Sequence, residues 1–230
     1  MHKFFRQRKS TVAAWEIEPI FRKVATLIVL RFNRMDHFRD KKTSLGQCLS
    51  EAHNFTGDEL ALITSCFNKR TCQEGDYLFH AGKVCSELFF VSGGAARITA
   101  LNEKFEDITY FFIGQGQLCT ILNSFNSGTI SENSIQACCK SEILAINKQR
   151  LSSLFEKVPH LNKVIDRIHQ NRLLDKIRLK NAYSGKDSTT CYNLFLSLQP
   201  EIANLAPLNH IASYLNITPQ SLSRIRRHAR

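Results

Sequence analysis

The chain has 230 residues, of which 43% are apolar and 22% charged, with ten glycines and five prolines. This composition excludes collagen-like, low-complexity and disordered proteins, and the length allows one large domain or two smaller ones with real hydrophobic cores. The 31 lysines and arginines against 20 aspartates and glutamates give a net charge of +11, which favours a polyanionic partner such as nucleic acid or a membrane surface.

The charge is distributed unevenly along the chain. Residues 1–50 carry +7, residues 51–150 carry −3, residues 151–185 carry +4 and residues 186–230 carry +3. The longest apolar stretch near the start, Val24–Leu30, is far shorter than the roughly 20 residues of a membrane-spanning helix, and the charges around it do not suit a secretory signal. We therefore expect a cytoplasmic protein that does not enter the membrane.

The eight cysteines form no Cys-x-x-Cys pair and show no spacing with histidine that is typical of metal ligands. We therefore expect no metal site, no cofactor and free thiols in a reducing compartment. Cys138 and Cys139 are adjacent in an expected strand, where neighbouring side chains point to opposite faces, so one should lie in the core and the other outside. Ordinary packing explains this pair, and redox sensing is the alternative.

Residues 1–47 form a basic extension to which the sequence assigns no role. Arginines and lysines are scattered through a weak helical pattern, and a second methionine stands at Met35. Translation that starts at Met35 and a basic amphipathic arm are two hypotheses for this stretch.

Residues 48–150 have the pattern of a β domain. A short helix at residues 56–67, which Thr56 can cap, precedes several short runs rich in β-branched and aromatic residues. Turn-forming residues separate these runs, which is typical of an all-β sandwich or barrel. We expect strands at residues 77–79, 87–91, 96–100, 108–113, 134–137 and 142–146.

Residues 151–182 have apolar residues at helical spacing with charged residues between them, which predicts a long amphipathic helix with a jog at Pro159. Its apolar stripe suits a helix that pairs with a second copy, with Leu161, Ile165 and Ile168 at the dimer interface. The alternative is a helix that lies on its own β domain.

Residues 183–230 end in two short helices around a tight corner. Asn216 tolerates the left-handed conformation that a three-residue turn requires, Thr218 caps the second helix and Pro219 suits its first position. The small side chain of Ala212 lets the two helices approach closely. This pattern favours a helix-turn-helix over an ordinary basic helical hairpin.

The second helix, residues 219–228, carries the chemistry expected of a recognition helix in the DNA major groove. Gln220 and Arg224 share one face, and their side chains can pair bidentately with adenine and guanine. Hydroxyl and further cationic side chains suit contacts with phosphates. The expected DNA-binding residues are Thr218, Gln220, Ser221, Ser223, Arg224, Arg227 and His228.

On these residues the chain resembles the Crp/Fnr family of bacterial transcription regulators, in particular its Bacteroidetes type, over residues 48–230. The resemblance rests on Glu-Gly-Asp-Tyr-Leu-Phe-His-Ala-Gly at residues 74–82 and, more specifically, on residues 211–227. It implies an α+β fold with an N-terminal β-roll, a double-stranded β-helix like that of cyclic nucleotide-binding domains, then a long dimerisation helix and a C-terminal helix-turn-helix domain. It also implies a homodimer on a palindromic DNA operator, with RNA polymerase as a further partner.

The sequence departs from the family's cyclic nucleotide site. The family holds the ribose with a Gly-Glu pair and the cyclic phosphate with an arginine, whereas no arginine occurs here between Arg97 and Arg150. A buried phosphate without a cation is costly, so we expect no tight binding of cyclic AMP and a pocket that is degenerate or takes an unidentified effector. The residues at the corresponding positions are Leu118, Cys119, Thr120, Ser131, Glu132 and Asn133.

The sequence also stops at Arg230, without the wing hairpin that often follows a recognition helix, so we expect additional DNA contacts from Lys176, Arg178 and Lys180. The overall prediction is a homodimeric, sequence-specific DNA-binding regulator. The alternative is a ligand-sensing module that acts through protein interaction. An enzyme is not expected, because the sequence has no nucleophile–base pair, phosphate loop or metal-ligand spacing.

Overall fold

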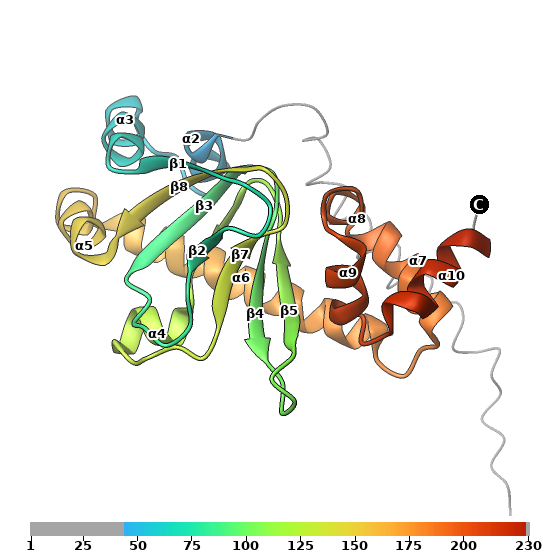
Figure 1. Cartoon of the computed structure of the whole chain (residues 1–230). Coiled ribbons are helices and arrows are strands. Elements are labelled where there is room, and N and C mark those ends of the chain that lie inside the picture. The colour runs from blue at the N-terminus through green and yellow to red at the C-terminus, as the bar shows by residue number, and fades with distance from the viewer. Residues whose placement is uncertain (1–43, 229–230) are drawn as a thin grey trace, which may run out of the picture. The chain divides into compact units, whose positions relative to one another are not determined.

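The computed structural model describes residues 44–228, which include two four-stranded antiparallel sheets (Figure 1). Every pair of neighbouring strands in both sheets is antiparallel. The first sheet has the strand order β1 (Asn68–Cys72), β8 (Ser141–Asn147), β3 (Glu87–Gly93) and β6 (Gln117–Cys119). The second has the order β2 (Tyr77–Phe79), β7 (Ser134–Ala137), β4 (Ala96–Leu101) and β5 (Asp107–Ile113).

A buried apolar core lies between the two sheets. The register pairs Phe89 with Ala145, and because side chains alternate along a strand, both point to the same face. They pack against Ile98 and Ile135 of the second sheet, and all four side chains are buried. The two sheets therefore close on each other as a roll.

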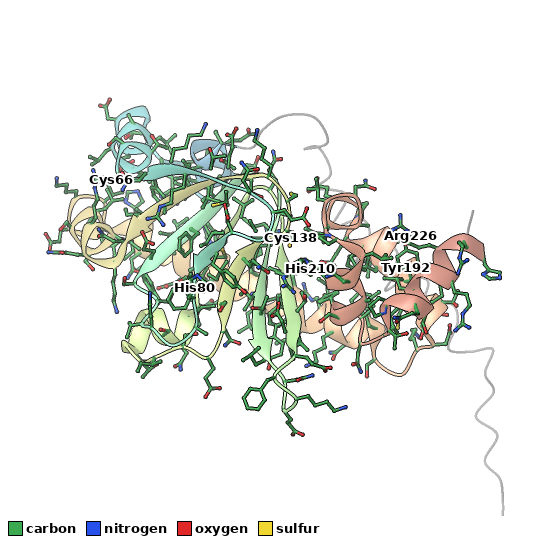
Figure 2. All side chains as sticks on the ribbon, viewed as in Figure 1. Cys66, His80, Cys138, Tyr192, His210 and Arg226 are labelled. Atoms are coloured by element: carbon green, nitrogen blue, oxygen red, sulfur yellow. The ribbon has the colours of Figure 1, made fainter. Side chains whose placement is uncertain are left out.

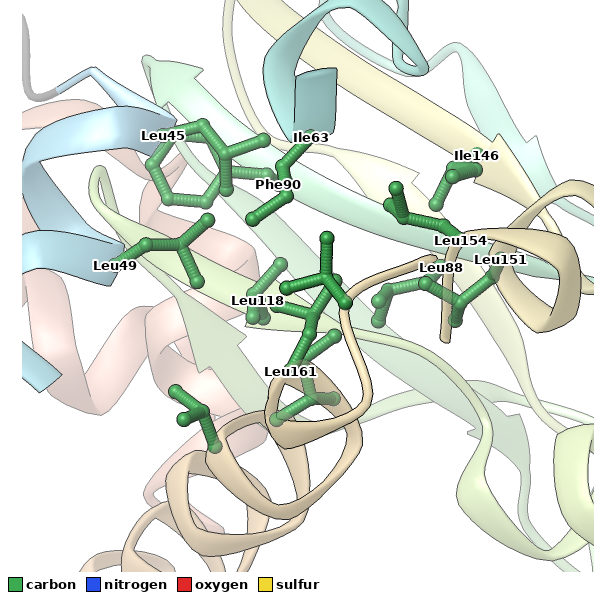
Figure 3. Close-up of a cluster of buried hydrophobic side chains, with 13 residues drawn as sticks. Leu45, Leu49, Ile63, Leu88, Phe90, Leu118, Ile146, Leu151, Leu154 and Leu161 are labelled. Atoms are coloured by element: carbon green, nitrogen blue, oxygen red, sulfur yellow. The ribbon is translucent and has the colours of Figure 1, made fainter. Parts of the chain in front are cut away.

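The outer face of the first sheet is covered by helices (Figure 3). Leu88, Phe90 and Leu118 point outward from this sheet and pack against leucines and isoleucines of the helices. These helices are α2 (Leu45–Ala52), α3 (Gly57–Ser65), α5 (Lys148–Lys157) and the start of α6 (His160–Tyr183). Thr56 caps α3 as expected: its Oγ1 accepts a hydrogen bond from the Glu59 amide at 3.2 Å.

The predicted long helix is two helices, because the chain breaks at Val158 and Pro159 between α5 and α6. Proline disfavours helical backbone in the residue before it, and Val158 accordingly has φ −132° and ψ 75°. Within α6, Leu161 and Ile165 are 1% and 6% exposed and belong to the core against the first sheet. The sequence predicts Leu161, Ile165 and Ile168 at a dimer interface, whereas in this structure the first two pack inside their own chain and Ile168 is partly buried against the same cluster.

A third core joins the C-terminal helices to the outer face of the second sheet. Phe112 and Cys138 come from the strand region, whereas Phe195, Ile211 and Leu222 come from the helices. The helices are α7 (Ser188–Leu198), α8 (Pro200–Leu205), α9 (Leu208–Tyr214) and α10 (Pro219–His228). One further helix, α4 (Leu122–Ser127), lies between β6 and β7 in the chain and ends at Gly128, whose φ is 69°.

All six predicted strands are present, each with the expected bounds or one to two residues longer. Strands β1 and β6 and helices α2, α4 and α8 were not predicted. Residues 1–43, including Met35, lie outside the described residues, and α2 crosses the expected boundary at residue 47. In the part of the chain that the structure describes, no helix has the length and apolar character needed to cross a bilayer.

Candidate nucleic-acid interface

The corner between α9 and α10 is built from local signals. Asn216 has φ 55°, and the amide of the next residue, Ile217, donates to the Ala212 carbonyl at 3.0 Å. Thr218 Oγ1 accepts from the Ser221 amide at 3.2 Å, which caps α10, and Pro219 is its first residue. The backbone therefore adopts the left-handed turn and the N-cap that the sequence predicts.

Two fully buried side chains hold the two helices together. Ala212 of α9 and Leu222 of α10 are both 0% exposed and lie in the same apolar cluster. The methyl side chain of Ala212 allows the close approach, and Ile217 closes the corner as a partly buried neighbour. The orientation of α10 is thus fixed by α9.

We expect the Asn216→Val variant to unfold more easily than wild type and Asn216→Gly to be within measurement error of it. A β-branched residue at φ 55° costs about 1–2 kcal/mol, whereas glycine adopts this conformation freely. Urea unfolding followed by circular dichroism measures both variants. Equal midpoints for Asn216→Val and wild type would contradict the structural role given to the turn.

One face of α10 is polar and exposed. Gln220, Arg224, Arg227 and His228 are exposed, and Ser221 and Ser223 are half-buried beside the inward-facing Leu222. Thr218 is exposed, and its hydroxyl lies 2.9 Å from that of Ser221. All seven residues expected to bind DNA therefore lie on or next to this helix, and five of them are exposed.

Arg226 is an exposed cation on α10 that sequence reasoning did not assign (Figure 2). It lies at the side of the helix between the buried and the outward faces, where a long side chain reaches a neighbouring phosphate backbone. The signal was present in the sequence as the adjacent pair Arg226 and Arg227. With Arg224 they give three cations, and none of the three forms an ion pair with a carboxylate of residues 44–228.

The additional basic segment on α6 is mostly engaged within the chain. Lys176 Nζ lies 4.5 Å from the centre of the Phe111 ring, and burial lowers the pKa of this lysine. Arg178 pairs with Asp175 at 3.2 Å, and Lys180 is exposed. The expectation that all three contact DNA is corrected for Lys176, whose ammonium already lies over an aromatic ring.

The first half of the expected effector pocket is divided between two faces of one strand. Leu118 packs into the outer core and Cys119 into the core between the sheets, as alternation along β6 requires. Thr120 donates its hydroxyl to the Glu87 carbonyl at 2.8 Å. These three side chains therefore do not line a common space.

The second half of the expected pocket forms its own turn. The Ser131 hydroxyl donates to the Asn133 carbonyl and accepts from the Asn133 amide, both at 2.9 Å. Glu132 is exposed. Because Leu118 and Cys119 lie on opposite faces of β6, the six predicted residues do not line a single pocket.

Arg97 is a buried, hydrogen-bonded cation whose environment the sequence did not predict. It is 3% exposed, and its guanidinium donates to Thr109 Oγ1 at 2.9 Å and to Gln136 Oε1 at 2.9 and 2.6 Å, and pairs with Asp107. It alternates along β4 with Ile98, which faces the space between the sheets, so Arg97 lies on the outer face. Its charge is therefore not available inside the roll.

Burial makes Cys138, the first of the two adjacent cysteines, a poor nucleophile. Cys138 is buried and Cys139 is half-buried, and all eight cysteines are free thiols. Burial raises the pKa of Cys138 to about 12, so its thiolate form is scarce at neutral pH. This is the packing arrangement expected for the pair.

Residues 69–158 match the family model of the cyclic nucleotide-binding domain, and no match was found among curated proteins. A structure of CLP, titled a c-di-GMP-responsive global regulator of Xanthomonas campestris, is 18% identical and has a TM-score of 0.60, with 76% of this chain and 91% of that chain covered. A protein titled a transcriptional regulator of the Crp/Fnr family from Eubacterium rectale is 16% identical, with a TM-score of 0.59 and coverage of 76% and 83%.

A structure of a CooA variant from Carboxydothermus hydrogenoformans is 15% identical, with a TM-score of 0.55 and coverage of 83% of this chain and 86% of that chain. At such identities these likenesses concern the fold alone. Residues 69–158 therefore match the cyclic nucleotide-binding domain family, and the described chain, with its β-roll and C-terminal helices, has the fold of Crp/Fnr-type transcription regulators.

Proposed function

We propose that the protein is a sequence-specific DNA-binding transcription regulator in which α9 and α10 form a helix-turn-helix and α10 enters the major groove. The observation that carries this proposal is the exposed face of α10, where Gln220, Arg224 and Arg227 lie outward without a carboxylate on the same helix. Glutamine and arginine at this spacing suit adenine and guanine edges. The turn at Asn216 and the buried Leu222 support a rigid reading helix.

The proposal includes a homodimer formed through the second half of α6. Leu173, Leu174 and Ile177 are each about half exposed and lie on one side of the helix. A cavity of about 420 Å³, lined in part by Phe125 and Leu173, borders this stripe. A second copy of α6 would cover the exposed leucines and isoleucine, and a two-fold dimer would present two α10 helices to half-sites about one DNA turn apart.

We expect no cyclic AMP site inside the roll, because the hydroxyls of Thr120 and Ser131 are used within the chain and Arg97 is turned outward. A ligand with a dissociation constant near 10 μM would, at about 1 mM, stabilise the fold by about 2.7 kcal/mol, which is several degrees in melting temperature. We expect 1 mM cyclic AMP, about a hundredfold above such a constant, to shift thermal unfolding by less than about one degree. A rise of five degrees would contradict this expectation.

One observation favours a protein-interaction role as a second candidate. Phe105, at the tip of the turn between β4 and β5, is 83% exposed and has φ 60°, which is strained for an aromatic residue. Asn102 holds the turn rigid, because its side-chain oxygen accepts from the amides of Lys104 and Glu106, each at 2.9 Å. A rigid exposed phenylalanine suits insertion into an apolar pocket of a partner protein.

Binding to DNA of selected and random sequence separates the two candidates. A regulator binds its selected duplex more tightly than a random one, and the double variant Gln220→Ala, Arg224→Ala reduces that preference while salt-dependent binding to random DNA remains. The Phe105→Ala variant is the matched control and leaves the preference unchanged. If wild type shows no preference for the selected duplex and the double variant binds both duplexes as tightly as wild type, the result favours a protein-interaction module over a DNA-binding regulator.

A further inference from the structure

Helix α9 is docked on the outer face of the second sheet. The Thr109 amide of β5 donates to Ser213 Oγ of α9 at 2.9 Å. The Phe112 ring lies 5.1 Å from that of Tyr214 and 6.1 Å from that of Phe195, measured between ring centres. The strands and the C-terminal helices thus share a core, and the surface between them is called the seam below.

Arg97 ties together the three strands that form the sheet side of the seam. From β4, its guanidinium bonds Thr109 and Asp107 of β5 and Gln136 of β7. Gln136 in turn donates to the Gly75 carbonyl at 2.9 Å. The surface on which α9 rests therefore contains one buried cation whose charge is balanced by one carboxylate.

His210 of α9 lies at the seam (Figure 2). Its Nδ1 is buried and has no hydrogen-bond partner among residues 44–228. Burial and the positive charge of Arg97 lower the pKa of His210 to about 4, and Asp107 acts weakly in the opposite direction. The imidazole is neutral in this arrangement, because a proton would place a second cation near Arg97 at a partly buried position.

We propose that the seam is a latch that sets the orientation of α10 and that protonation of His210 opens it. Leu222 of α10 lies in the same core as Ala212 and Ile211 of α9, so α10 follows any movement of α9. The consequence for DNA binding rests on the proposed function, whereas the opening of the latch does not. Acid weakens the docking of α9 on the second sheet.

The direction in which pH changes the docking of α9 follows from the protonation of His210 in the docked and released states. When α9 is released, the imidazole returns to its ordinary pKa of 6.5, so below this pH the released state binds more protons. Docking is therefore unaffected by pH above about 6.5 and weakens as pH falls from 6.5 towards 4. One pH unit changes the docking equilibrium by at most about tenfold, and by less because the imidazole is only partly buried.

Hydrogen exchange of the Thr109 amide, which donates to Ser213, measures the latch in the full chain. The protection factor at pH 7.5 and at pH 5.5 is the intrinsic exchange rate of an unstructured peptide at that pH divided by the measured rate. Wild type should lose about threefold to tenfold of its protection at pH 5.5. In the His210→Gln variant the Thr109 amide should stay protected at both pH values, and in Ser213→Ala it should lose protection at both. The amide of Phe90 in the first sheet is the internal reference, and its protection should be the same in wild type and in both variants.

Two results separate the latch from the function of α10. Equal protection of the Thr109 amide at both pH values in wild type, or the same loss in His210→Gln, would overturn the latch. Binding of the same samples to random DNA is measured in parallel. If wild type binds no DNA at either pH while the protection still follows His210, the proposed function fails and the latch stands.

Discussion

We expect the Ile177→Glu variant to be a folded monomer and the Ile165→Glu variant to be unfolded. Ile177 is 48% exposed, so a glutamate there costs the single chain little, but it would be buried without a partner between two copies of α6. Ile165 lies in the core, and a carboxylate buried there costs several kcal/mol, a large share of the roughly 5–15 kcal/mol that stabilises a typical domain.

Sedimentation and circular dichroism together measure oligomeric state and folding. Ser153→Glu is the matched control, because it adds the same charge to an exposed position of α5, outside α6 and its stripe of Leu173, Leu174 and Ile177. It should leave the dimer intact. A dimer in the Ile177→Glu sample would show that another surface holds the two copies together.

The second large effect concerns two arginines of the same helix. Arg224→Ala should lose the preference for one base pair in each half-site, at a cost of about 1–3 kcal/mol, or roughly tenfold to a hundredfold in affinity for the preferred site. Arg227→Ala should weaken binding to all sequences alike and lower the slope of log affinity against log salt by about one.

Titrations of preferred and random duplexes at several salt concentrations distinguish these outcomes. Arg150→Ala serves as the control, because Arg150 is an exposed cation on α5, remote in the chain from α10. Equal losses for Arg224→Ala and Arg227→Ala on both duplexes would contradict the separate roles assigned to them.

The corner between α9 and α10 could be predicted because its causes are local. A cap at Thr218, a left-handed Asn216 and Pro219 at the first helical position each act within a few residues of the chain. Six strands were visible for a similar reason, since their apolar and β-branched runs contrast with the turns between them. Strand β1 was not visible, because Asn-Lys-Arg-Thr at its start is polar and exposed at the edge of the sheet.

The proposed dimer surface of Leu173, Leu174 and Ile177 and the arrangement of the expected effector residues could not be predicted in the same way, because both depend on tertiary packing. Periodicity shows that Leu161, Ile165 and Ile177 share one apolar pattern, but not that the β domain covers the first two and leaves the third exposed. Arg97 looked like an ordinary strand residue, and its burial follows from side-chain partners on β5 and β7 and from the docking of α9 on the outer face of the second sheet.

Selection of bound sequences from a random DNA pool, at about 150 mM salt and with and without cyclic AMP, tests the central claim most directly, since affinity depends steeply on salt. We predict that a palindrome with half-sites about one turn apart is recovered under both conditions. Recovery of no enriched sequence under either condition would contradict the account of α10 as a reading helix, and a palindrome that requires cyclic AMP would contradict the account of the β-roll.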